Sequence, residues 1–201
     1  ANNSPRHRAK ITGVVTYRDR TMLMVQDRTG GAEVKGNNIE GVRVGDKVEA
    51  VGFPDGEGET VALREAVVRE TGNVESPEPI KMMMEGVLNG RLNQWLVQVE
   101  GIVLDQKNRQ GWQLLELQNG QRVFGAVLPA DAGQLKPISA GSRVSITGVT
   151  QLQITSRTPE NATAGHDPLI ATMNILMRTP GDLVLLERPP WWTWRHTASV
   201  A

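Results

Sequence analysis

The stretch GDKVEAVG at residues 45–52 returns as GSRVSITG at residues 141–148, and both copies read G-x-x-V-x-x-x-G. Each copy lies downstream of an apolar run with a central glycine, ITGVV at residues 11–15 and VEGIV at residues 99–103. The segments in between alternate apolar and polar residues and end in glycine-containing turns, as short strands joined by hairpins do. The repeat therefore predicts two copies of one small β-barrel.

The first copy has room for five strands. Residues 9–17, 21–26 and 32–35 form a predicted meander, and residues 47–53 and 60–70 supply two further strands that close the barrel. Five short strands in a closed barrel of this size are typical of an OB-fold. The second copy has the same pattern of predicted strands and turns, so we expect the same fold for it.

The whole pattern predicts an all-β chain with minor α content, made of two tandem OB-fold-like five-stranded barrels. We expect the first barrel over residues 9–75 and the second, with a C-terminal strand, over residues 95–178. Residues 76–94 are expected to form a Pro-containing linker and a short helix at residues 80–92. Residues 179–201 form a Trp-rich connector.

Composition excludes some function classes. The chain has 201 residues, 22 basic and 22 acidic side chains, and no cysteine. Balanced charge lacks the cationic field that usually gathers phosphate backbones, so we expect nucleic acid not to be the partner. The absence of cysteine removes disulfides and thiol chemistry. No apolar run in the sequence reaches the length of a membrane span.

The candidate ligand-binding residues lie where OB barrels commonly meet their ligands, on the second strand and the turn before it. In the first copy these are Tyr17, Arg18, Arg20 and Gln26, which suit an anion or a sugar. The alternative is a solvated turn with ordinary surface arginines. In the second copy Trp95 and Trp112 could stack on the bases of a single-stranded nucleic acid, or instead pack in a core or between the barrels.

Three tryptophans stand close together near the end of the chain. Trp191, Trp192 and Trp194, beside Arg195, suit a membrane interface, because indole rings rest at headgroup depth while basic side chains meet phosphates. The alternative is that these indoles cap a barrel core or a partner protein.

Catalytic and metal-binding motifs are missing from the sequence. It contains no P-loop, no G-x-S-x-G and no H-E-x-x-H, so we expect no catalytic residues and no enzymatic activity in this chain. Asp55, Glu57 and Glu59 alternate with glycines but lack the full calcium-loop pattern, and we read them as an acidic hairpin. We predict neither a metal site nor a cofactor.

Several segments together resemble a known family. GVVTYRD at residues 13–19, VQDRTGG at 25–31, VGDKV at 44–48, and DLVLL at 182–186 leading into PPWWT at 189–193 are similar to the extracytoplasmic input region of membrane-bound bacterial sensor kinases. The resemblance implies tandem OB-like barrels, then a transmembrane helix soon after PPWWT. It also implies cytoplasmic histidine kinase, hybrid kinase or diguanylate cyclase modules beyond that helix.

The function that we expect follows from this resemblance. It is an input domain that senses a small-molecule or protein ligand in the periplasm, as the extracytoplasmic part of an inner-membrane protein whose full-length form could be a dimer. Two alternatives stay open: a soluble single-stranded nucleic-acid-binding OB-fold protein, and a protein-interaction module that adds a strand to a sheet edge.

Overall fold

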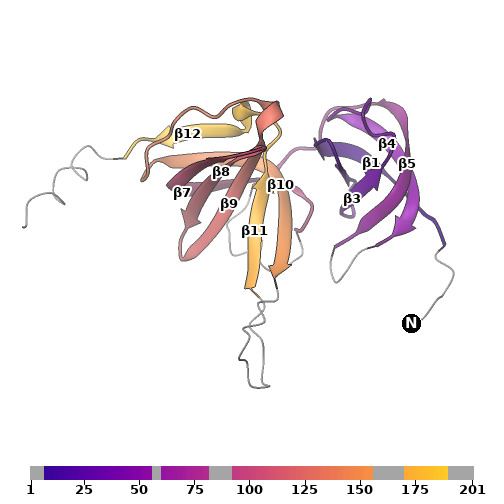
Figure 1. The fold of residues 1–201 in the computed structure, drawn as a ribbon, viewed down its shortest axis with the longest axis horizontal. Helices are drawn as coiled ribbons and strands as arrows, with labels where there is room; N and C mark the ends of the chain where they lie inside the picture. The colour runs from indigo at the N-terminus through magenta and orange to yellow at the C-terminus, as the bar shows by residue number, and fades with distance from the viewer. Residues whose placement is uncertain (1–6, 56–59, 82–91, 156–169, 190–201) are drawn as a thin grey trace, which may run out of the picture.

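The computed structural model describes residues 7–55, 60–81, 92–155 and 170–189, which form two β-barrels lying side by side (Figure 1). The predicted fold class is confirmed: apart from short 3-10 turns, the regular secondary structure of the described residues is all strand, and each barrel has the strand order of an OB-fold. We call the N-terminal one barrel 1 and the C-terminal one barrel 2.

Barrel 1 closes on itself in the order β1-β2-β3-β5-β4. β1 pairs antiparallel with both β2 and β4, whereas β3 and β5 run parallel. The barrel interior is filled by aliphatic side chains, among them Val15, Leu23, Val25, Val48 and Leu63. The strands of barrel 1 are β1 (Ala9–Arg18), β2 (Leu23–Gln26), β3 (Gly31–Gly36), β4 (Asp46–Pro54) and β5 (Ala62–Asn73).

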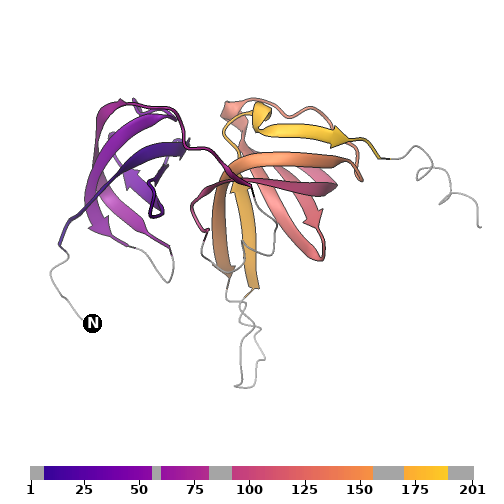
Figure 2. The ribbon, with the colours of Figure 1, turned by 180° about the vertical axis from the view of Figure 1, so that it is seen from behind.

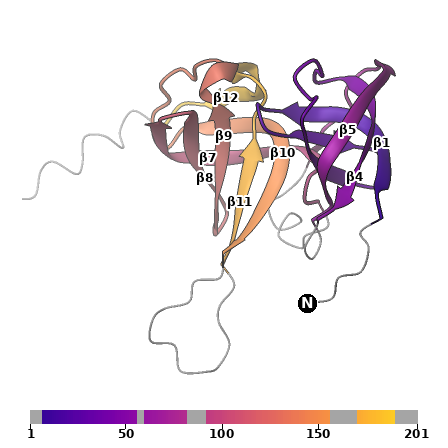
Figure 3. The same ribbon diagram turned by 45° about the vertical axis from the view of Figure 1, so that its right-hand side comes forward.

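Barrel 2 repeats this order as β7-β8-β9-β11-β10, with β9 and β11 parallel and β10 returning to pair with β7. Two short strands extend its sheet. β6 (Ile80–Lys81) runs parallel to β7. β12 (Leu183–Glu187), labelled in Figure 3, pairs antiparallel with β10. The strands of the barrel itself are β7 (Leu96–Arg109), β8 (Trp112–Asn119), β9 (Arg122–Pro129), β10 (Arg143–Thr155) and β11 (Ile170–Leu176).

The repeated phrase has the same structural role in both barrels. Its first glycine, Gly45 or Gly141, begins the fourth strand from a turn with φ of +96° or +84°, a region that side chains disfavour. Its last glycine, Gly52 or Gly148, lies where the fifth strand crosses closely. A Cβ atom there would stand 2.7 Å from the carbonyl oxygen of Arg64 or 2.5 Å from that of Leu176. The spacing of the two glycines in the repeated motif therefore reflects one turn before the strand and one close contact with the neighbouring strand.

The barrels pack directly against each other, and the chain crosses between them after β5 (Figure 2). Their shared apolar cluster joins Tyr17, Met22 and Met24 of barrel 1 to Leu96, Val149 and Leu176 of barrel 2. Buried glutamines add hydrogen bonds. The Leu96 N–H donates to Gln26 Oε1 at 2.8 Å, and the side-chain amide of Gln94 bonds both the N–H and the C=O of Val61.

The structure differs from the sequence prediction at the linker. Ile80 and Lys81 form β6 rather than the start of a helix, because their backbones find a partner in β7. The remaining residues of the expected helix, 82–91, lie outside the described part of the chain. Within the described ranges no helix has the length and apolar character needed to cross a membrane.

Candidate ligand-binding cleft between the barrels

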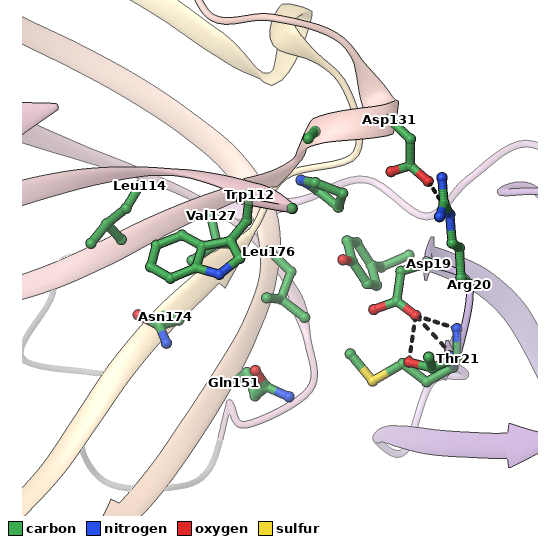
Figure 4. A pocket seen from close by; sticks show the side chains of 15 residues that line it. Asp19, Arg20, Thr21, Trp112, Leu114, Val127, Asp131, Gln151, Asn174 and Leu176 are labelled. Atoms are coloured by element: carbon green, nitrogen blue, oxygen red, sulfur yellow. Dashed lines mark hydrogen bonds and ion pairs between the residues drawn. The ribbon is translucent and has the colours of Figure 1, made fainter. Parts of the chain in front are cut away.

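A cleft of about 740 Å³ opens where the outer face of barrel 2 meets the β1–β2 turn of barrel 1 (Figure 4). One wall is the sheet formed by β8, β9, β11 and β10, and the opposite wall is the turn at residues 19–22. In an OB-fold, the face of the second and third strands is a common ligand-binding surface. Because β8 and β9 are these strands in barrel 2, the cleft lies on that surface.

Trp112 is the largest side chain of the barrel 2 wall. It begins β8, in which Gln113 and Leu115 point into the barrel, so Trp112 and Leu114 point outward. Val127 lies beside them on β9. The indole is 37% exposed and faces the cleft (Figure 4). An exposed aromatic face over an aliphatic floor can stack against a flat ring.

Two side-chain amides lie beside the indole. Gln151 on β10 and Asn174 on β11 are directly paired across the two strands, and both line the cleft. Gly125 on β9 makes room for the second amide, because a Cβ atom at Gly125 would collide with Asn174 Oδ1. Among the described residues neither amide has a side-chain hydrogen-bond partner, so both can bond the edge of a bound molecule.

The barrel 1 wall is a turn held by a carboxylate. Asp19 Oδ1 accepts hydrogen bonds from the N–H and the hydroxyl of Thr21, at 2.7 and 2.8 Å, and from the N–H of Met22 at 3.0 Å. The fixed turn leaves Arg20 free to reach across the cleft. There its Nε donates to Asp131 Oδ2 at 2.8 Å, which links the two barrels (Figure 4).

Tyr17 lies at the base of this turn and is 3% exposed. Burial, first, and then the negative charge and hydrogen bond of Asp19 and the charge of Asp131 raise the pKa of the Tyr17 phenol above its ordinary value. The phenol therefore stays protonated and neutral at physiological pH. It can act in the cleft as a hydrogen-bonding group but not as a base.

The side chains that line the cleft carry a net charge of −1. Its lining carries the cation Arg20 and the carboxylates Asp19 and Asp131, one of which is paired with that cation. Stacking and amide hydrogen bonds, rather than a strong field, are therefore what it offers a ligand. In the described part of the chain, no three acidic or histidine side chains lie close enough to hold a metal ion.

The structure brings three of the predicted ligand-binding residues together in the cleft: Tyr17, Arg20 and Trp112. Two others serve the fold instead. Arg18 donates to the carbonyl oxygen of Val42 at 3.0 Å, and Gln26 is used at the barrel interface. The remaining one, Trp95, is partly buried against the core of barrel 2. Trp191, Trp192, Trp194 and Arg195 lie outside the described residues.

Sequence reasoning missed the two amides. Asn174 interrupts the apolar run IATMNIL of β11, and a polar residue at an outward position was the available signal. Gln151 carries no such mark, because it lies in a strand with several polar neighbours. Their pairing depends on which strands become neighbours, which is not visible locally.

Comparison with known proteins gives matches to solved structures alone. No family model matches the chain, and no curated protein does. The Ifi202 HINa domain in complex with 20-bp double-stranded DNA is 10% identical, with a TM-score of 0.40 over 92% of this chain and 98% of that one. The p202 HIN1 domain in complex with 12-mer double-stranded DNA is 11% identical, with a TM-score of 0.40 over 87% and 92%. The tetrameric p202 HIN2 domain is 15% identical, with a TM-score of 0.38 over 92% and 97%.

Two of these structures contain double-stranded DNA, and this finding contradicts our expectation that nucleic acid is not the partner. That expectation was wrong in its physical basis, because it considered net charge alone, whereas an OB-fold face can also bind nucleic acid by stacking and hydrogen bonding. Identities and TM-scores this low carry no assignment of function.

Proposed function

We propose that the chain is a nucleic-acid-binding OB-fold protein that holds a single strand along barrel 2, with one base stacked on Trp112. The observation that carries the proposal is the outward-facing, 37% exposed indole on the second strand of barrel 2, beside the amides of Gln151 and Asn174. Stacking on an aromatic side chain in an OB groove is a recurrent way of binding unpaired bases.

The parts of the cleft match the parts of a nucleotide. The indole supplies a flat platform, and every base has a flat face. The two amides each offer a donor and an acceptor, which suit the hydrogen-bonding edge of a base that no longer pairs with another strand. Arg20 at the rim is the cation of the cleft and suits the backbone.

The same cleft supports binding rather than catalysis. Its carboxylates are engaged, Asp19 by its own turn and Asp131 by Arg20, and the Tyr17 phenol is held neutral. We therefore propose that the chain recognises its ligand without transforming it.

The test is fluorescence anisotropy of short labelled oligonucleotides at low salt, single-stranded and duplex. Stacking on one aromatic is worth about 1–3 kcal/mol, so Trp112→Ala should weaken single-strand binding about 5- to 150-fold. Trp112→Phe should keep part of the affinity, because a smaller flat face remains. As a matched control, Val123→Ala removes a 62% exposed side chain of β9 that does not line the cleft, and should change nothing.

Two results would refute the proposal. One is no detectable binding of any oligonucleotide at low salt, where electrostatic attraction is strongest. The other is binding that Trp112→Ala leaves intact, which would place the nucleic acid on another surface. Stronger binding of duplex than of single strands would contradict the stacked base.

A second candidate is the input region of a membrane-bound signalling protein, exposed outside the cytoplasm, as the resemblance implies. It is supported by the pairing of β12 with β10, because the DLVLL segment that carries part of the resemblance is thereby tied to barrel 2. The encoded sequence beyond residue 201 tests it. An apolar run of about 18 residues would agree with this candidate, and a polar continuation would contradict it.

A further inference from the structure

The contact between Arg20 and Asp131 joins the two barrels across the mouth of the cleft. Among the described residues it is the ion pair that connects barrel 1 with barrel 2. The Arg20 side chain is 82% exposed and that of Asp131 is 46% exposed. An ion pair this open to water is weak, so either partner exchanges readily for another ion of the same sign.

The backbone next to Asp131 is tied to the residue that precedes Trp112. It lies in a short 3-10 turn, Ala130–Ala132, directly after β9. The N–H of Ala130 donates to the carbonyl oxygen of Gly111 at 3.0 Å, and Gly111 immediately precedes Trp112. The Asp131 backbone is therefore anchored near the start of the Trp112 strand, while its side chain is free to turn away, and both residues line the cleft in which a stacked nucleotide would lie.

We propose that Asp131 occupies the phosphate position of the cleft: its carboxylate stands in for a nucleotide phosphate on Arg20 and is displaced when nucleic acid binds. This inference rests on the proposed function and adds its anion-binding residue and its internal competitor. Arg20 holds Asp131 through its Nε–H, and a guanidinium can donate the same N–H to a phosphate oxygen, so the exchange does not require Arg20 to move.

The neighbouring charges limit the position to one phosphate. Asp19, the other carboxylate of the cleft, is held by the N–H groups of Thr21 and Met22 and by the Thr21 hydroxyl, so it stays in place. Once Asp131 is displaced, both carboxylates repel further phosphates. Asp131 therefore lowers the affinity for polyanions, and the stacked base must supply most of the binding.

The experiment compares the intact chain with Asp131→Asn, Arg20→Ala and the double variant, using a labelled oligothymidylate over a range of salt. Asp131→Asn should bind about three- to tenfold more tightly, and its salt dependence should steepen by about one phosphate contact. The gain should vanish in the double variant, which should match Arg20→Ala. Asp105→Asn, which neutralises an exposed carboxylate away from the cleft, is the control for net charge.

A second probe separates this inference from the proposed function. Inorganic pyrophosphate is titrated into Asp131→Asn while the Arg20 Nε–H signal is followed by NMR. If pyrophosphate shifts the Arg20 Nε–H signal but no oligonucleotide binds, Arg20 is an anion-binding residue and the proposed nucleic-acid function is refuted. Oligonucleotide binding that Asp131→Asn does not tighten, or tightens equally without Arg20, would overturn the inference alone. No response to either probe would overturn both.

Discussion

Gln26 should be worth more to stability than a polar side chain at the end of a strand normally is. Its Oε1 accepts the N–H of Leu96 at 2.8 Å across the barrel interface, and the two residues are 4% and 1% exposed. Gln26→Leu keeps about the same volume but leaves the Leu96 N–H buried without a partner. An orphaned buried donor costs about 1–3 kcal/mol, so the free energy of unfolding should fall by that amount.

Urea denaturation measures this loss, and hydrogen exchange locates it. The Leu96 amide should exchange faster in Gln26→Leu, while amides in the centre of each barrel keep their relative protection. Gln118→Leu is the matched control, because the Gln118 amide bonds the Gly120 carbonyl oxygen on an exposed turn and its loss should cost little. If the unfolding free energy of Gln26→Leu stays within about 0.3 kcal/mol of the original, the interface bond does not hold the barrels together.

Three further predictions test other parts of the structure. Tyr17 is the sole tyrosine of the chain, so ultraviolet titration should show no phenolate near pH 10 while the protein is folded. Burial, and next Asp19, raise the pKa of the Tyr17 phenol in the folded state. The stability that the neutral phenol contributes is therefore complete below the pKa of the unfolded chain, and it is lost as the pH rises from there through the folded pKa. Gly52→Ala and Gly148→Ala should each lower the unfolding free energy by about 1–3 kcal/mol in urea titrations, and a large difference between them would contradict their equivalence. Asp182→Ala removes a buried carboxylate that accepts four hydrogen bonds in the turn before β12, and thermal melts should show a loss of at least about 1.5–3 kcal/mol.

The barrels were predictable because their constraints are local in the sequence. Gly45 and Gly52 are seven positions apart, and one turn and one strand crossing require them to be glycines. The same spacing at Gly141 and Gly148 therefore predicts the equivalent strand in barrel 2. Alternation within each strand then decides which side chains face the barrel interior.

The cleft was only partly predictable, because it depends on how one barrel docks on the other. Trp95 and Trp112 are alike to sequence reasoning, yet the first packs on a core and the second lines the cleft. What separates them is a contact between residues far apart in the chain, such as Gln26 and Leu96. No local pattern encodes such a pair, so the exposure of each indole had to come from the structure.

The docking also explains why two similar barrels offer one open binding face. In barrel 1 the outward side chains of the second strand are Met24 and Gln26, and both are buried against barrel 2. In barrel 2 the outward side chains at the start of that strand are Trp112 and Leu114, and they line the cleft. When this face of barrel 1 packs against barrel 2, the β1–β2 turn of barrel 1 comes to lie opposite the face of β8 and β9 that stays open. A ligand that contacts both walls of the cleft binds more tightly when the barrels are docked. By linkage, its binding favours docking by the same free energy.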